Sequence, residues 1–185
     1  MGMSPDIDLY DHDRSNTVRY TLGLRRKRTL YCFGINPSTA TPEKLDPTVR
    51  KVRQIAESNC YDGWVMFNVY PKRETVFSQL HSNRGDDIHQ KNVEWILYRV
   101  MEDPFHVDFW CAWGNLLLGK TYLRDCFLDI LQAVTAEKDV NWLCAGLNQN
   151  GTPKHPLYLR KDTKLISFDM SSHKLPKIST IYFLK

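Results

Sequence analysis

Strand-like and helix-like segments alternate along this chain, and that alternation limits the fold more than any other feature of the sequence. Apolar runs bounded by turn residues predict buried strands at 29–35, 64–70, 107–113 and 141–147. Amphipathic stretches with apolar residues at helical spacing predict helices at 46–59, 86–101 and 121–136. Alternation at this spacing indicates a three-layer α/β/α fold around a mainly parallel central sheet, with helices on both faces.

The N-terminal region predicts an addition to that sheet. Residues 1–16 are polar and we expect them to form an irregular arm, whereas Thr17–Leu24 has the loose alternation of a strand. This strand and the strand at 29–35 flank a short polar link, which predicts a β-hairpin. We therefore expect a single α/β domain over residues 17–170.

The basic link of that hairpin has two interpretations. Its residues are Arg25, Arg26, Lys27 and Arg28. They form either a solvated turn that keeps an edge soluble or a surface that contacts phosphates, and Arg50 and Arg53 on the following helix could extend that surface. A net charge of +4 permits an anionic partner, such as a nucleotide or nucleic acid, without requiring one.

The remaining composition predicts a cytoplasmic protein without a membrane segment. No apolar run approaches the length of a membrane span, and the acidic start lacks the pattern of a signal peptide. The 5 cysteines are odd in number and contain no CxxC pair, so we expect reduced thiols, with Cys32, Cys111 and Cys144 in the core. A short strand is expected at 164–168. Residues 171–185 form a tail whose apolar part, Ile178–Leu184, is suited to dock on a neighbour or to form an edge strand.

Polar residues follow the predicted strands where each one ends. Asn36, Asn68 and Gly114 come just inside or after three of them, and His155 lies in the loop after the fourth. Right-handed crossovers bring the carboxyl ends of parallel strands to one edge of a sheet. Because ligands of open α/β folds bind at that edge, we expect these residues to share one site.

The chemistry of these side chains suits recognition of a heterocycle better than metal binding. Asn36 and Asn68 each combine a donor and an acceptor, as the edge of a uracil-like base does, although Asn36 before a proline also suits a simple turn. His155 could act as an electrophile or as a general acid or base, or could only tie its loop together. Without other ligands at suitable spacing, His155 does not predict a metal site.

Neighbouring residues could line the same site. Gly34, Ser38 and Thr39 belong to the first polar loop, and Tyr70, Trp113 and Tyr158 could stack on a ring, although aromatic residues on strands are more often core. The chain has no GxSxG elbow, Walker loop or GxGxxG motif, so serine hydrolysis, triphosphate hydrolysis and a nicotinamide cofactor lack support. We expect no cofactor.

Five short motifs together resemble a bacterial and phage domain family of unknown function. That family shares an NPSTA…DPT…R…WG…G-x-P-x-HPLYL pattern. The matching residues here are Asn36–Ala40, Asp46–Thr48 with Arg50, Asn68, Ala112–Gly114 and Gly151–Leu159. The resemblance covers about residues 17–168.

The same family resembles a distant branch of the uracil-DNA glycosylase superfamily. The resemblance implies a four-stranded parallel sheet flanked by helices. Gly34-Ile35-Asn36-Pro37 resembles the first motif, in which the asparagine orients the attacking water. Asn68 resembles the base-reading asparagine, and His155-Pro156 resembles the start of the last motif, in which the histidine stabilises charge on the departing base.

Three function classes therefore remain open. The first is an enzyme that acts on a base or nucleotide, in its most specific form by hydrolysing an N-glycosidic bond after the base is flipped out of DNA. The second is a module that binds a nucleotide, a modified base or nucleic acid without turnover. The third is an interaction protein whose loop motifs are structural. The sequence does not define the base, the strand state or the oligomeric state.

Overall fold

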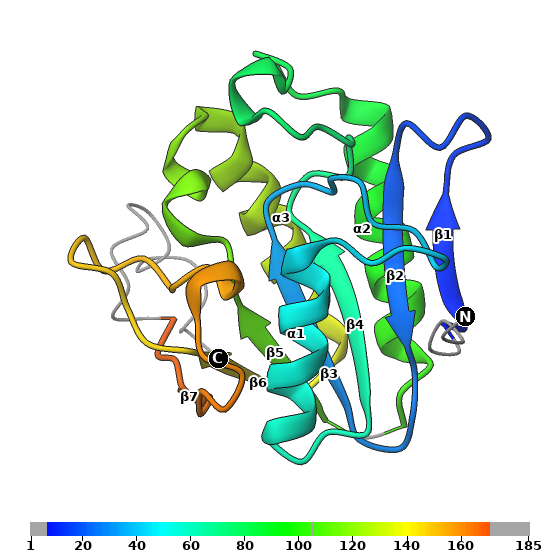
Figure 1. Cartoon of the computed structure of the whole chain (residues 1–185). Helices are drawn as coiled ribbons and strands as arrows, with labels where there is room; N and C mark the ends of the chain where they lie inside the picture. The colour runs from blue at the N-terminus through cyan, green and yellow to red at the C-terminus, as the bar shows by residue number, and fades with distance from the viewer. Residues whose placement is uncertain (1–6, 105, 171–185) are drawn as a thin grey trace.

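The computed structural model describes residues 7–104 and 106–170, whose strands form one mixed sheet (Figure 1). The strands are β1 (Leu9–His12), β2 (Arg19–Leu24), β3 (Thr29–Gly34), β4 (Gly63–Asn68), β5 (Val107–Cys111), β6 (Val140–Cys144) and β7 (Ile166–Ser167). Over these residues the sheet has 7 strands in the order β1-β2-β4-β3-β5-β6-β7. Strands β4, β3, β5 and β6 run parallel to one another in the centre, and β1, β2 and β7 are added antiparallel at the two sides. The expected α/β architecture with a parallel centre is confirmed.

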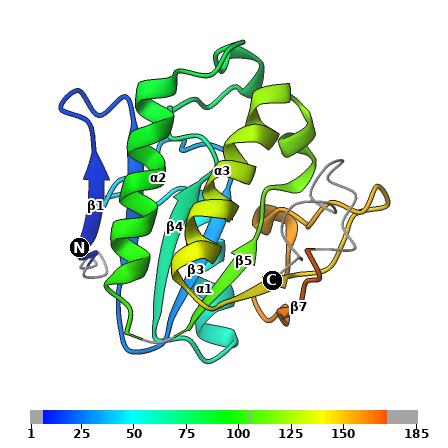
Figure 2. The ribbon, with the colours of Figure 1, turned by 180° about the vertical axis from the view of Figure 1, so that it is seen from behind.

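The helices cover both faces of the sheet. They are α1 (Pro47–Ser58), α2 (Asp86–Met101) and α3 (Thr121–Glu137), and short 3₁₀ helices occur at η1 (Phe77–Gln79), η2 (Gly114–Leu118) and η3 (Pro156–Tyr158). Helix α1 lies on one face in Figure 1, and the reverse view in Figure 2 shows α2 and α3 on the other. Each helix starts and ends within a few residues of the predicted bounds.

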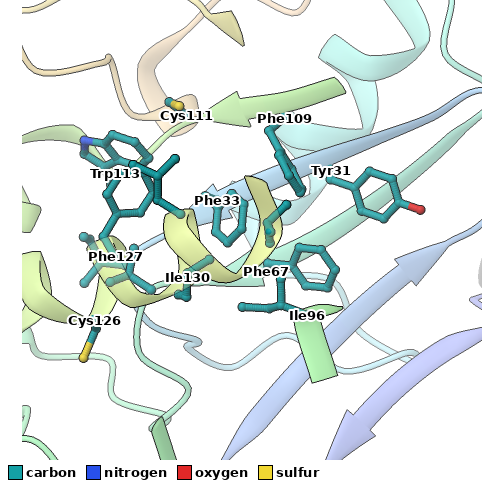
Figure 3. Packing of buried hydrophobic residues seen from close by; sticks show 14 of the residues in the cluster. Tyr31, Phe33, Phe67, Ile96, Phe109, Cys111, Trp113, Cys126, Phe127 and Ile130 are labelled. Carbon is teal, nitrogen blue, oxygen red and sulfur yellow. The ribbon is translucent and has the colours of Figure 1, made fainter. Parts of the chain in front are cut away.

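Two apolar layers hold the helices against the sheet. Side chains of alternate strand residues point to opposite faces, so Phe33 and Phe67 pack under α2 and α3, whereas Leu30 and Trp64 pack under α1. Figure 3 shows the first layer, in which Phe127 of α3 meets Phe33 with 6.4 Å between ring centroids. Cys32, Cys111 and Cys144 are buried, as predicted.

The predicted hairpin between residues 17–24 and 29–35 is wrong. Strand β4 lies between β2 and β3, and β2 pairs with β1 on its other side. β3 has no free edge for β2 because it is central in the parallel set, with β4 and β5 as its neighbours. Residues 9–12, expected to be irregular, form β1, the edge strand of the true hairpin.

Helix α1 begins as the sequence predicts, and its start lies at the edge where the parallel strands end (Figure 1). Asp46 is the N-cap, Pro47 is the first helical residue, and the backbone N–H of Val49 donates to Asp46 Oδ1 at 2.9 Å. Within the described residues, none of the helices is both long and apolar enough to cross a membrane. The apolar segment Ile178–Leu184 lies outside the described residues.

Candidate functional site

The ends of β3 and β4 form the floor of the candidate site. Gly34 and Asn68 are direct neighbours in the parallel register. The pairing continues past the strands, because the N–H of Val69 donates to the Gly34 carbonyl at 3.0 Å and that of Tyr70 to the Ile35 carbonyl at 2.9 Å. The two chains therefore leave the sheet side by side.

Asn68 is the most unusual residue of this edge. It is 1% exposed, and neither its Oδ1 nor its Nδ2 has a hydrogen-bond partner among the described residues. Its position is fixed from the backbone, since Asn92 Nδ2 of α2 donates to the Asn68 carbonyl oxygen at 2.9 Å. A Cβ at Gly34 would lie 3.2 Å from Asn68 Oδ1, so the glycine leaves room beside this amide. Buried polar atoms without partners are rare and costly in proteins.

Asn36 is half-buried and faces the segment that follows β4. Its Nδ2 donates to the Glu74 carbonyl oxygen at 2.7 Å and to the Pro37 carbonyl oxygen at 3.2 Å. Only its side-chain oxygen is left to meet a ligand or water. Ser38 Oγ lies 3.4 Å from Thr75 Oγ1, and Thr39 is exposed, so both hydroxyls remain at the rim of this loop.

Two arginines that were not predicted as site residues, Arg19 and Arg73, form hydrogen bonds to the same loop. Arg19 Nη1 and Arg73 Nη2 both donate to the Ala40 carbonyl oxygen, at 3.1 and 3.0 Å. Arg73 also donates to the Ser38 carbonyl oxygen and to Tyr10 Oη. Burial and the neighbouring Arg73 lower the pKa of Arg19 to about 10, against the opposing charge of Asp46. Arg19 could have been identified from the sequence, because it is a charged residue within a mainly apolar predicted strand.

His155 lies on the α1 side of the edge and is held as a neutral imidazole. It caps η3, accepting the backbone N–H of Leu157 on Nδ1 at 3.3 Å, and this contact leaves the ring proton on Nε2. Burial lowers the pKa of His155 below its usual 6.5, and the charge of Asp46 opposes that effect. Gly114, with φ of +61°, allows the close approach, because a Cβ there would lie 3.1 Å from His155 Cβ.

A polar network anchors the His155 loop to the end of β5. Asn115 Oδ1 accepts hydrogen bonds from Thr152 Oγ1 at 2.6 Å and from Asn150 Nδ2 at 2.9 Å. Asn148 Nδ2 adds a contact at 3.3 Å. Asn115 therefore joins the loops after β5 and β6, which places His155 relative to Gly114.

A family model described as a protein of unknown function (DUF1643) matches residues 19–157. The chain belongs to this family. The match runs from β2 to the His155 loop and so contains Gly34, Asn36, Asn68, Gly114 and His155. Comparison with curated proteins gave no match, and comparison with solved structures gave none either.

Of the aromatic residues expected at the site of this DUF1643 member, two lie in the core instead. Tyr70 and Trp113 are fully buried, Trp113 with its ring centroid 4.5 Å from that of Phe127 and Tyr70 with its hydroxyl accepting the Gly85 N–H at 2.9 Å. Both rings pack in the core in this conformation. Tyr158 is 89% exposed on η3, so it borders the site from the surface.

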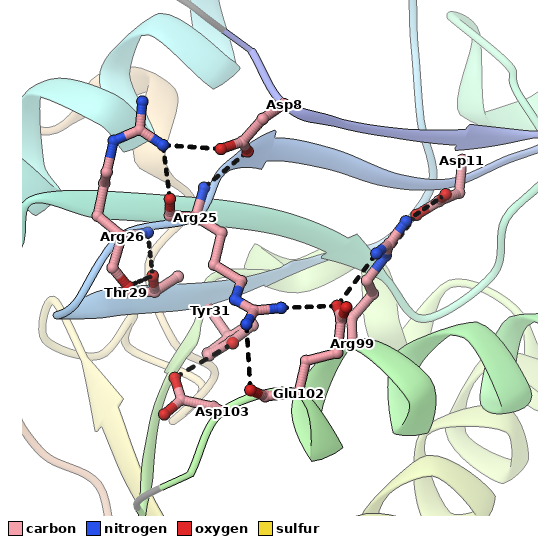
Figure 4. A network of polar contacts seen from close by, with 9 residues as sticks. All are labelled: Asp8, Asp11, Arg25, Arg26, Thr29, Tyr31, Arg99, Glu102 and Asp103. Carbon is pink, nitrogen blue, oxygen red and sulfur yellow. Dashed lines mark hydrogen bonds and ion pairs between the residues drawn. The ribbon is translucent and has the colours of Figure 1, made fainter.

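The basic turn 25–28 lies at the opposite end of the sheet from the site. It precedes β3, whereas Asn36 follows it, and the strand separates them by roughly 20 Å. Two of its four charges are paired within the molecule, Arg25 with Glu102 at 2.8 Å and Arg26 with Asp8 at 2.7 Å (Figure 4). A phosphate surface here would not serve the candidate site.

Arg50 and Arg53 lie closer, on the exposed face of α1. Arg50 donates to the Leu45 carbonyl oxygen, and Arg53 pairs with Glu57 at 2.8 Å. Within residues 7–104 and 106–170, no group of three or more histidine, cysteine or acidic side chains is arranged to hold a metal ion.

Two sizeable cavities lie away from the edge. One of about 690 Å³ lies between the β1–β2 turn and α2, beside Trp95 and Tyr98, and one of about 670 Å³ lies beside β6, next to Trp142 and Phe168. Asn36, Asn68 and His155 line neither of them. The side chain of Asn68 is 1% exposed, so its amide is closed off from solvent in this conformation.

Proposed function

We propose that the edge formed by Asn36, Asn68 and His155 binds a nucleobase and hydrolyses its N-glycosidic bond. One observation carries the proposal: the buried carboxamide of Asn68 has no partner for its donor or its acceptor among the described residues. A uracil-like base presents an acceptor and a donor side by side, so a flipped base would satisfy both atoms.

The other two residues have complementary roles in this proposal. His155 offers its Nε2 proton to the base, where a neutral donor stabilises the negative charge that develops as the bond breaks. Asn36 offers its free carbonyl oxygen, which can orient a water molecule.

The resemblance of the motifs to the uracil-DNA glycosylase superfamily supports this reading. It implies a parallel sheet flanked by helices, with the reactive residues after successive strands, and β4, β3, β5 and β6 with α1, α2 and α3 form such a sheet. The superfamily relationship itself is part of the proposal.

The test is release of free base from duplexes that carry uracil, hypoxanthine or a thymine mismatch, measured by chromatography. We expect release from at least one substrate and its loss in Asn68→Ala. Asn141→Ala is the matched control, because Asn141 is exposed on β6 and contacts Asp108 at 2.9 Å, far from the edge. No release from any of these duplexes by folded protein would refute the proposal.

A specific observation favours a second candidate, a binding module without turnover. Asn36 uses its amide in a loop contact, Ser38 stands where the resemblance implies glycine, and Leu157-Tyr158-Leu159 replaces the small residues of the last motif. Such a module would bind a nucleotide or modified base with an affinity that Asn68→Ala abolishes, and no base would be released. Calorimetry with nucleosides and nucleotides distinguishes this candidate from the enzyme.

A further inference from the structure

Hydrolysis at this edge requires a group that takes a proton from water, and neither Asn36 nor His155 can do so. A carboxamide does not accept a proton at neutral pH. The Nδ1 of His155 already accepts the Leu157 N–H, and its Nε2 carries the ring proton. The residues that the resemblance assigns therefore leave the site without a base.

Asp46 is placed to fill that role. It caps α1, on which η3 packs, and His155 caps η3, so the two residues stand at the starts of neighbouring helices. Asp46 Oδ1 is occupied by the Val49 N–H at 2.9 Å, while no hydrogen bond within residues 7–104 and 106–170 uses its Oδ2. The residue is half-buried, so the carboxylate is partly accessible to solvent.

Asp46 stands at the N-terminus of α1 and close to two basic side chains. The start of a helix stabilises negative charge. The charge of Asp46 acts on the buried guanidinium of Arg19 and on the imidazole of His155, so Asp46 lies near both groups.

We propose that Asp46 is the general base of this site, a role that rests on the hydrolysis proposed above. Water attacks the sugar carbon C1′ as its bond to the base nitrogen breaks. The new C1′–O bond forms, the bonding electron pair leaves with the base, and the proton of the water passes to Asp46 Oδ2. His155 donates a hydrogen bond to the departing base, and the base then takes up a proton from solvent.

The substitution Asp46→Asn isolates the charge, because asparagine is as good an N-cap as aspartate and α1 keeps its first hydrogen bond. Asp46→Ser also keeps a capping side chain, and it tests whether an effect of Asp46→Asn is specific to asparagine. The control is Glu57→Gln, which removes a negative charge from the last turn of the same helix, where Glu57 pairs with Arg53.

The first measurement needs no substrate: the His155 side chain is titrated by NMR in the full chain. Asp46→Asn and Asp46→Ser should weaken proton binding at His155 by about threefold, because an anion that favours the imidazolium is removed. Glu57→Gln should leave the titration unchanged. An unchanged titration in the Asp46 variants overturns the placement of Asp46 beside His155.

The second measurement is the rate of base release against pH, with the duplex that the wild-type protein cleaves. Asp46→Asn should lower kcat by about 100-fold or more, with little change in KM. A wild-type rate in Asp46→Asn overturns the role as base. If the wild-type protein releases no base, the proposed function fails and the role of Asp46 falls with it, whereas the NMR result still decides the placement.

Discussion

At the scale of single residues, the side chain of Asn68, unpartnered among the described residues, lowers the stability of the folded chain. A buried amide without partners costs about 1–3 kcal/mol relative to one that is hydrogen-bonded. The neighbouring Asn92 is satisfied on its donor side, because its Nδ2 donates to the Asn68 carbonyl oxygen at 2.9 Å, while its Oδ1 has no partner among the described residues. Residues that break a local rule without a compensating contact tend to serve function.

This contrast gives a first prediction about stability. Asn68→Ala should change the free energy of unfolding by less than about 1 kcal/mol, because the lost volume is offset by removal of an unsatisfied amide. Asn92→Ala should cost about 1–3 kcal/mol, because it leaves a buried carbonyl oxygen without its donor. Urea unfolding of both variants measures the difference, and an equal loss in the two would contradict the distinction.

His155 gives a prediction about pH. Burial lowers its pKa below 6.5 in the folded chain, so the unfolded chain binds more protons as the pH falls. Its contribution to stability is therefore full above pH 6.5 and is lost on acidification below it. Urea unfolding at pH 7.5 and 5.5 should show a smaller fall in His155→Asn than in the wild-type protein.

His89 shares this behaviour, because burial lowers its pKa despite the nearby Asp129, so the variant at 155 retains part of the fall. His12→Asn, at an exposed position of β1, is the control. A wild-type pH dependence in His155→Asn would show that His155 is not buried as described.

At the scale of elements, the loop after β3 depends on the segment after β4. The Arg73 N–H donates to the Thr17 carbonyl oxygen at 2.9 Å, and its guanidinium spans Tyr10, Ser38 and Ala40. One side chain thereby joins the β1–β2 hairpin, the Asn36 loop and the end of β4. The loop that carries Asn36 is therefore shaped by residues distant in sequence.

Arg73→Ala should release that loop. We expect a loss of about 2–3 kcal/mol in unfolding free energy, because several charge-assisted hydrogen bonds disappear, and faster amide exchange over residues 36–41. Arg53→Ala removes an exposed pair with Glu57 and should cost less than about 1 kcal/mol. Hydrogen exchange followed by mass spectrometry reports both variants, and unchanged exchange over 36–41 would refute the clamp.

The turn 25–28 gives a prediction about nucleic acid. Because it lies at the far end of β3, the triple variant Arg26→Ser, Lys27→Ser, Arg28→Ser should leave the affinity for any bound duplex within about twofold at matched salt. If these side chains did neutralise phosphates in the wild-type protein, the triple variant would show a shallower dependence of log affinity on log salt. The slope would fall by about 0.9 for each phosphate contact that is lost. Fluorescence anisotropy titrations measure this slope, and a shallower slope in the triple variant would show that the turn contacts nucleic acid.

At the scale of the whole molecule, the sequence predicts those features of the fold that depend on residues close together in the chain. Helix α1 starts at Pro47 because the cap at Asp46 is a local signal, and the strand ends carry Asn36, Asn68 and Gly114 because turn residues interrupt apolar runs. Convergence at one edge then follows from the handedness of the crossovers.

Features that depend on contacts between residues distant in the chain could not be predicted in this way. The hairpin prediction failed because neighbouring strands in sequence need not be neighbours in the sheet, and Gly23, whose added Cβ would lie 2.4 Å from the Trp64 carbonyl oxygen, lets β2 pack on β4 instead. Arg19 and Arg73 meet only in the folded chain, and the burial of Tyr70 and Trp113 depends on α3.

The insertion of β4 between β2 and β3 has a consequence for how the chain reaches this structure during synthesis. The hairpin of β1 and β2 leaves the ribosome first, yet its partner, residues 63–68, is made about 40 residues later. Until then β2 presents an unpaired edge, and exposed edges of this kind promote aggregation. The N-terminal hairpin is thus the part of the nascent chain most in need of protection.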